Sequence, residues 1–251
     1  MTKTYGKNGN IKVNVFDSYE ELSLAAADFV ADKMKGNDKV ILGLATGSSP
    51  IGLYDGLVAK YENGELDFSS VRSFNLDEYY PLSPENDQSY RYFMNANLFD
   101  RVNIDKDNTR VPNGLAQDVE KECADYDAAL EAAGGQDVQV LGIGGNGHIG
   151  FNEPSEVFVY ATHKVTLTKE TIEANSRFFE SEADVPRYAI TMGMKAIMLA
   201  KSIVLVANGE GKAQAIADML CGEVTAKCPA SILQEHPDVH VFIDKEAAKL
   251  L

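Results

Sequence analysis

A glycine-rich segment carries the residues best suited to acid–base chemistry. Within Gly142–Pro154, His148 is one of four histidines in the chain and lies close to Asn146 and Glu153. An imidazole oriented by a carboxylate is a common acid–base arrangement near neutral pH, and closely spaced glycines let backbone approach a ligand. A lone loop histidine is more often structural, but three polar groups within eight residues favour a functional role.

A second segment contains a carboxylate that could act as a general base. Asp77 follows the predicted strand Val71–Leu76, and Glu78 is its neighbour. Burial and a nearby carboxylate both raise a carboxyl pKa, which suits a general base. Taken alone, an aspartate at this position is more often a helix cap or turn residue.

A third segment could bind phosphate. Ala45–Pro50 is a turn of small residues between a predicted strand and a predicted helix, with hydroxyls on Thr46 and Ser48 and with Ser49 as the expected N-cap. Free backbone N–H groups and the positive end of a helix dipole bind anions there. An ordinary capped turn fits the same residues equally well. Lys212 opens a later helix and could reach a phosphate at the same edge, although alone it resembles a solvated surface lysine.

Two nucleotide-binding motifs are not supported. Gly142, Gly144 and Gly147 formally fit a dinucleotide fingerprint, but that motif must open a helix. The residues that follow, Gly150–Pro154, show no helical stripe. Gly209–Lys212 lacks the spacing of a P-loop.

The composition describes an ordinary globular chain with a strong negative charge. Of 251 residues, 45% are hydrophobic and 24% charged, and the formal net charge is −15. That charge opposes broad nucleic-acid binding. The three cysteines fit neither a disulfide framework nor a zinc pattern, and no apolar stretch is long enough to span a bilayer. We therefore expect a cytoplasmic protein with no metal site, no nucleic-acid partner and no membrane partner.

Short β-rich runs alternate with helical runs along the chain. This alternation predicts an α/β fold, a Rossmann-like three-layer arrangement with a mostly parallel sheet flanked by helices. No linker or repeat divides residues 1–251, so we expect one domain. Ligands bind such sheets outside the carboxyl ends of the strands, where Thr46, Asp77, Asn146, His148 and Asn208 are expected. The expected strands are Ile11–Phe16, Val40–Leu44, Val71–Leu76, Val138–Ile143, Ala189–Met192, Ser202–Ala207 and Val239–Ile243, with one more near Val165; the expected helices include one opened by a Ser18–Glu21 capping box, one over Ser89–Phe99 and one over Asp118–Ala133.

At these segments the chain resembles the glucosamine-6-phosphate deaminases, of the glucosamine/galactosamine-6-phosphate isomerase family. The similarity runs in register over most of the chain, and the long histidine motif is its most specific part. The stretches that carry it are Leu42–Pro50, Phe74–Tyr79, Gly145–Pro154 and Asn175–Phe179.

The resemblance implies an enzyme that isomerises and deaminates D-glucosamine 6-phosphate with water, in amino-sugar catabolism, and that needs no metal or organic cofactor. It implies that Asp77 abstracts the proton at C2 of the open-chain sugar. His148 would move the proton during ring opening, supported by Glu153 and Asn146. The implied phosphate-binding residues are Thr46, Gly47, Ser48, Arg177 and Lys212.

Two departures from the family pattern matter. Some members have aspartate where this chain has Asn146, and an amide cannot share a proton, so Glu153 is expected to carry more of the ring-opening role. One branch of the family is a hexamer activated by N-acetylglucosamine 6-phosphate through basic interface residues, whose positions here match His163 and Val165. We expect an enzyme without that activation, and the sequence leaves open whether it is a monomer or a homo-oligomer. It also leaves open whether Val157–Thr162 is a moving lid or core.

Two other functions fit less well. A 6-phosphogluconolactonase shares the Gly-His loop, but lactonases typically have Asp-Glu-Arg where this chain has Asp77, Glu78 and Tyr79. A phosphosugar-sensing domain of a transcription regulator needs a basic DNA-binding module. The strand expected at Ile11 leaves no room for one upstream.

Overall fold

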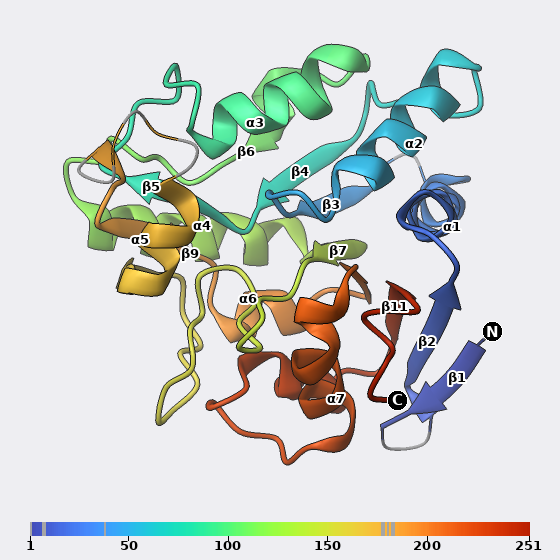
Figure 1. Cartoon of the computed structure of the whole chain (residues 1–251). Helices are drawn as coiled ribbons and strands as arrows, with labels where there is room; N and C mark the ends of the chain where they lie inside the picture. Colours follow the sequence, from blue (N-terminus) through green and yellow to red (C-terminus); the bar gives the residue numbers. More distant parts are fainter. Residues whose placement is uncertain (1, 7–8, 38, 177–178, 180, 182–183) are drawn as a thin grey trace.

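The protein is built around one large sheet. The computed structural model describes residues 2–6, 9–37, 39–176, 179, 181 and 184–251, without the side chains of 170, 174 and 175. Helices flank the sheet (Figure 1), and every neighbouring pair of its strands is parallel except β1 and β2. Across the sheet the strands follow the order β1 (Thr2–Tyr5), β2 (Ile11–Phe16), β11 (Val239–Asp244), β10 (Ser202–Ala207), β7 (Val138–Leu141), β3 (Ile41–Leu44), β4 (Arg72–Asn75) and β6 (Thr109–Arg110). The predicted α/β fold with a mostly parallel sheet is confirmed.

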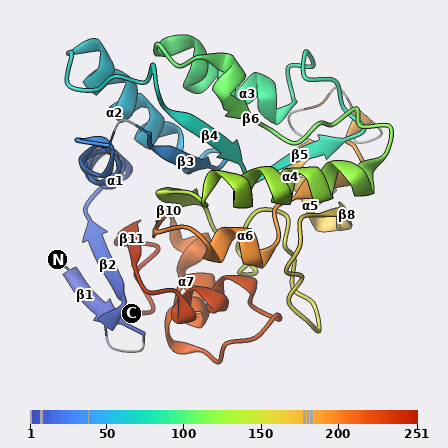
Figure 2. The ribbon, with the colours of Figure 1, turned by 180° about the vertical axis from the view of Figure 1, so that it is seen from behind.

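Helices connect the strands and pack in pairs. α1 and α2 pack against each other, and Figure 2 shows α4 beside α6. Ser18 caps α1 as expected, because its Oγ accepts the N–H of Glu21 at 3.2 Å. The helices are α1 (Tyr19–Met34), α2 (Ile51–Glu62), α3 (Tyr90–Asn97), α4 (Val119–Ala133), α5 (Lys169–Ser176), α6 (Met194–Met198) and α7 (Ala213–Cys221).

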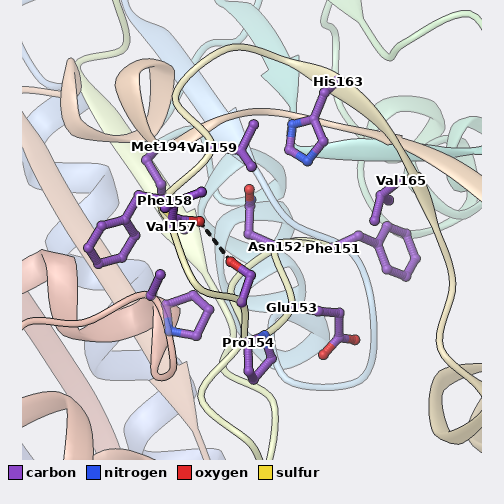
Figure 3. Close-up of a pocket in the computed structure, with 13 residues that line it drawn as sticks. Phe151, Asn152, Glu153, Pro154, Val157, Phe158, Val159, His163, Val165 and Met194 are labelled. Carbon is purple, nitrogen blue, oxygen red and sulfur yellow. Dashed lines mark hydrogen bonds between the residues drawn. The ribbon is translucent and has the colours of Figure 1, made fainter.

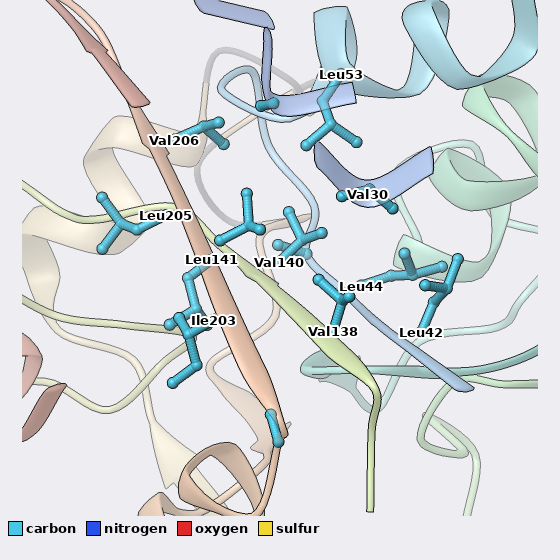
Figure 4. Packing of buried hydrophobic residues seen from close by; sticks show 14 of the residues in the cluster. Val30, Leu42, Leu44, Leu53, Val138, Val140, Leu141, Ile203, Leu205 and Val206 are labelled. Carbon is cyan, nitrogen blue, oxygen red and sulfur yellow. The ribbon is translucent and has the colours of Figure 1, made fainter. Parts of the chain in front are cut away.

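The central strands are buried on both faces, which explains their mostly apolar sequences. All six residues of β10 and all four of β7 and of β3 are buried. Figure 4 shows side chains of these strands meeting Val30 of α1 and Leu53 of α2. This packing holds the carboxyl ends of β3 and β7, and the loops that follow them, in fixed positions.

A second, smaller sheet was not predicted. It is antiparallel, with the order β5 (Asp77–Tyr80), β9 (Tyr188–Thr191) and β8 (His163–Thr166). β4 ends at Asn75, one residue before the predicted end at Leu76, and Asp77, which was expected just after that strand, also begins β5 opposite Thr191. The alternation of side chains predicts a strand but does not say which sheet it joins.

Candidate active site

An open pocket of about 380 Å³ lies beyond the ends of β3 and β7. Segments far apart in the sequence line it, as expected at this edge of a parallel sheet. Six of the predicted site residues are among the lining: Thr46, Gly47, Ser48, Asp77, His148 and Lys212. Asn146 and Glu153 are not in the lining but contact His148. Arg177 lies outside the described residues.

The turn after β3 forms one wall of the pocket. Gly47 has a φ of +89°, a conformation that favours glycine. The expected cap is wrong, because α2 begins at Ile51 and is preceded by Pro50, which has no side-chain acceptor. The N–H of Gly52 is bonded instead by the hydroxyl of Tyr19, at 2.9 Å. The turn thus keeps the geometry of an anion site while its own serine hydroxyls stay available to a ligand.

Lys212 brings a cationic side chain to the pocket. Its side chain is half-buried, and burial lowers the pKa of its ammonium group. Within the described part of the chain no carboxylate forms an ion pair with it. A partly desolvated cation without a protein counterion favours binding of an anion, and it shares the pocket with the turn at Thr46.

Asp77 forms the floor of the pocket. It is only 5% exposed, and burial, with a smaller contribution from the charge of Glu78, raises its pKa to about 8. Gly150 lies directly against it: a Cβ added there would be 3.3 Å from Oδ2 of Asp77 and 3.0 Å from Oγ1 of Thr191. Only a glycine, here with a φ of +58°, lets the histidine loop come this close.

Glu78 ties the base to helix α3. Its buried carboxylate accepts the backbone N–H groups of Tyr79 and Tyr90 at 2.9 Å each and of Arg91 at 3.0 Å. Burial raises the pKa of Glu78, while these three N–H groups and the charge of Arg91 act in the opposite direction. The contacts also bring Tyr90 into the pocket lining. Sequence reasoning missed Tyr90, although it follows the N-cap Ser89.

His148 is oriented by hydrogen-bonding interactions with Asn146 and Glu153. Its Nδ1 lies 2.7 Å from Oδ1 of Asn146 and 3.4 Å from Oε2 of Glu153. The amide of Asn146 donates from Nδ2 to the same Oε2 at 2.8 Å, so Oδ1 is turned toward the imidazole and Nδ1 must be the donor. The remaining ring nitrogen, Nε2, is then free to accept a proton. The ring lies over Gly144, where an added Cβ would be 2.2 Å from it.

Glu153 is the charged member of this hydrogen-bonded group. Burial alone raises its pKa, but hydrogen bonds and charge from His148, followed by hydrogen bonds from Asn146 and Thr171, bring the pKa down to about 2. Thr171 of α5 donates to Oε1 at 2.8 Å and also lines the pocket. Glu153 is therefore ionised across the neutral range. Thr171 was not predicted, and no local pattern marks it.

The histidine loop is fastened to the strand that faces Asp77. The N–H of Phe151 donates to Oγ1 of Thr191 at 3.1 Å, and Nδ2 of Asn152 donates to the carbonyl of Met192 at 2.9 Å. Since Thr191 is paired with Asp77, the imidazole and the carboxylate are presented to the same pocket. This is the arrangement that the sequence motifs required.

A second, smaller cavity of about 170 Å³ is lined in part by the segment Phe151–Pro154 (Figure 3). His163 and Val165 line it, and its lining residues include neither lysine nor arginine. Val157 at its rim is 70% exposed, whereas Thr162 is buried and bonded to Asp127. Among the described residues, no helix combines the length and apolar character needed to cross a membrane.

Comparison with known proteins is consistent with this geometry. Residues 17–241 match a family model described as glucosamine-6-phosphate isomerases/6-phosphogluconolactonase. A protein named glucosamine-6-phosphate deaminase from Clostridium perfringens is 55% identical over 241 residues, which are 96% of this chain and 100% of that protein. One of the same name from Thermoanaerobacter pseudethanolicus is 54% identical over 96% of this chain and 95% of its own length.

Solved structures give the same result. One described as a monomeric glucosamine-6-phosphate deaminase superposes with a TM-score of 0.92 at 43% identity, over 95% of this chain and 99% of its own. A 6-phosphogluconolactonase from Thermotoga maritima reaches 0.74 at 19% identity, over 93% of this chain and 99% of its own. At that identity the likeness concerns the fold alone.

Proposed function

The chain belongs to the family of glucosamine-6-phosphate isomerases and 6-phosphogluconolactonases, and we propose that it is a glucosamine-6-phosphate deaminase. It converts D-glucosamine 6-phosphate and water into D-fructose 6-phosphate and ammonia, and so acts as a hydrolase of a carbon–nitrogen bond in amino-sugar catabolism. The observation that carries the proposal is the convergence of an anion site, a buried carboxylate and an oriented imidazole on one pocket.

Binding begins at the phosphate. The turn at Thr46, Gly47 and Ser48 offers N–H and hydroxyl donors, and the ammonium of Lys212 offers charge. Arg177 remains a predicted further ligand. Anchoring the phosphate fixes C1 and C2 of the sugar near the acid–base groups, and positioning of this kind lowers a barrier by several kcal/mol.

Ring opening is the task of His148. Its Nε2 takes the proton of the C1 hydroxyl, and a proton is returned to the ring oxygen as the C1–O5 bond breaks. The imidazolium formed in between is stabilised by Glu153, which is ionised and 3.4 Å from Nδ1. The Oδ1 of Asn146 holds the neutral imidazole of His148 in the tautomer with its proton on Nδ1, but the amide cannot itself accept a proton. This supports the larger role expected for Glu153.

Asp77 then moves a proton from C2 to C1. It takes the C2 proton, the electron pair forms the C1–C2 double bond of an enolamine, and the pair of the C1 carbonyl moves to O1, which takes a proton from the ammonium group. Return of the first proton from Asp77 to C1, with the nitrogen pair forming the C2–N double bond, leaves an imine at C2 and a hydroxyl at C1. Water adds to C2, the carbon–nitrogen bond breaks, and ammonia leaves. A pKa of about 8 keeps the free carboxyl largely protonated at neutral pH. The substrate ammonium at C2 favours its ionised form, so binding prepares the base.

The lactonase alternative is weaker. Lactone hydrolysis needs no base at C2, which would leave Asp77 without a role. The lactonase among the structural relatives described above is also far more distant than the deaminases. The direct test incubates the purified protein with glucosamine 6-phosphate and measures ammonia and fructose 6-phosphate. Absence of both from a folded sample would refute the proposal.

We further propose that N-acetylglucosamine 6-phosphate does not activate the enzyme. The cavity that contains His163 and Val165 has no lysine or arginine in its lining with which to hold a phosphate. Rates should depend hyperbolically on substrate with and without the acetylated sugar phosphate. A change from sigmoid to hyperbolic rates would contradict this. One domain over residues 1–251 and a cytoplasmic location remain predictions.

A further inference from the structure

A tyrosine outside the sequence motifs holds the phosphate turn. Tyr19 is the first residue of α1, and its hydroxyl lies 3.0 Å from the carbonyl oxygen of Ser48 and 3.0 Å from that of Ser49. The same hydroxyl accepts the N–H of Gly52 at 2.9 Å. One oxygen atom on α1 thus bonds both the turn and the first turn of α2.

The helices approach closely at this point because of a glycine. A Cβ added at Gly52 would lie 2.5 Å from Oγ of Ser23 and 3.2 Å from Cε1 of Tyr19. Both neighbours belong to α1, which packs along α2. The absence of a side chain at Gly52 is therefore what lets the Tyr19 hydroxyl reach the turn.

The direction of these bonds determines what the turn presents to the pocket. In a trans peptide the C=O and the N–H point in opposite directions. The carbonyl of Ser48 points at Tyr19, so the N–H of Ser49 points away from Tyr19. Ser48 and Ser49 both line the pocket, and within the described residues no acceptor is bonded to that N–H. Losing the Tyr19 hydroxyl would free this peptide group to rotate.

We propose that Tyr19 is a positioning residue for phosphate binding: its hydroxyl orients the Ser48–Ser49 peptide so that the N–H faces the substrate phosphate. The proposal deepens the proposed function and rests on it. Tyr19 itself does not line the pocket, so it acts only through the turn. Because phosphate binding precedes chemistry, its loss should weaken binding more than turnover.

The test is Tyr19→Phe in the full chain, because phenylalanine keeps the ring and removes only the hydroxyl. We expect the KM for glucosamine 6-phosphate to rise about five- to twentyfold, less than for complete loss of a hydrogen bond to a charged group, because the Ser49 N–H is misdirected and not removed. The Ki of inorganic phosphate, measured as a competitive inhibitor, should rise in parallel, and kcat should change less than about twofold. Tyr61→Phe is the matched control, since Tyr61 lies at the far end of α2 and packs edge-on against Phe68.

Three results would overturn the proposal: an unchanged KM and phosphate Ki, a fall in thermal stability alone, or a fall in kcat alone. Protection of the protein by inorganic phosphate against thermal unfolding gives a readout that does not depend on turnover. If the wild-type protein made no ammonia, the proposed function would fail. A phosphate-dependent thermal shift that Tyr19→Phe reduces would still support the role of Tyr19 in holding an anion.

Discussion

Ionised Asp77 should destabilise the fold, and replacing it by asparagine should reveal how much. The pKa of Asp77 is about 8 in the folded protein, against 3.8 for an ordinary aspartate. Between these values the folded state holds a proton that the unfolded state has lost, so the free energy of unfolding falls as pH rises through this range. A difference of about four pH units corresponds to an upper limit of about 6 kcal/mol once the group is fully ionised. Because Asp77 is 5% exposed, little of this is screened by solvent.

The assay is urea unfolding of the wild type and of Asp77→Asn at pH 5 and pH 9. At pH 5 both side chains are neutral in the folded state, but the unfolded aspartate is already ionised, so the variant should be more stable by up to about 1.6 kcal/mol. At pH 9 this advantage should be larger than at pH 5 by at least about 2 kcal/mol. Asp87→Asn, at an exposed position, is the matched control and should show no such pH-dependent gain. The same Asp77→Asn protein should make no fructose 6-phosphate and yet bind phosphate normally. An equal stability difference at both pH values would show that the carboxyl is not held protonated by its surroundings.

Four further changes test the remaining parts of the site. Glu78→Gln removes the smaller of the two causes that raise the pKa of Asp77, so the acidic limb of kcat/KM should move to lower pH by less than about two units, seen in a pH–rate profile. Glu153→Gln should lower the free energy of unfolding by about 3 kcal/mol at pH 7, because a carboxyl with a pKa of about 2 stabilises the fold above its ordinary pKa of 4.5. Urea unfolding at several pH values should show this deficit vanish as pH falls toward 2, and a constant deficit would contradict the assignment. His148→Gln should slow reaction of the closed sugar far more than that of the open-chain form, whereas equal losses on both would argue against a role in ring opening. Gly144→Ala should displace the imidazole, because the new Cβ would lie 2.2 Å from the ring; kcat should fall at least about tenfold, and unchanged kcat would mean that the loop can shift without harm.

Much of the fold follows from the sequence because its causes are local. β3 and residues Ile203–Ala207 of β10 are continuous apolar runs, and such runs are stable only where both faces of a strand are covered. Ser18 caps α1 with a bond that spans three residues. The rule that ligands bind at strand ends was enough to gather Thr46, Asp77 and His148 at one edge. The histidine motif also predicted its own polar chain, since Asn146 and Glu153 are close to His148 along the backbone.

Other features needed contacts between distant segments. The sequence indicated a strand at Thr191 and placed Asp77 just after a strand. It did not show that Asp77 begins a further strand paired with Thr191, because side-chain alternation carries no information about the partner strand. The neighbouring Glu78 suggested that the pKa of Asp77 is raised. The size of this pKa shift depends mainly on the burial of Asp77, which only the complete fold supplies.

The sequence by itself therefore determined most of the elements, the edge of the sheet that binds ligand and the residues able to do chemistry. Tertiary structure decided which groups support them: Thr171 on Glu153, and Tyr19 on the turn at Ser48. These supports join segments separated by 18 and 29 residues through single hydroxyl groups. A single hydrogen bond imposes no periodic pattern on the chain, so it becomes visible only when the packing of helices and strands has brought its two partners together.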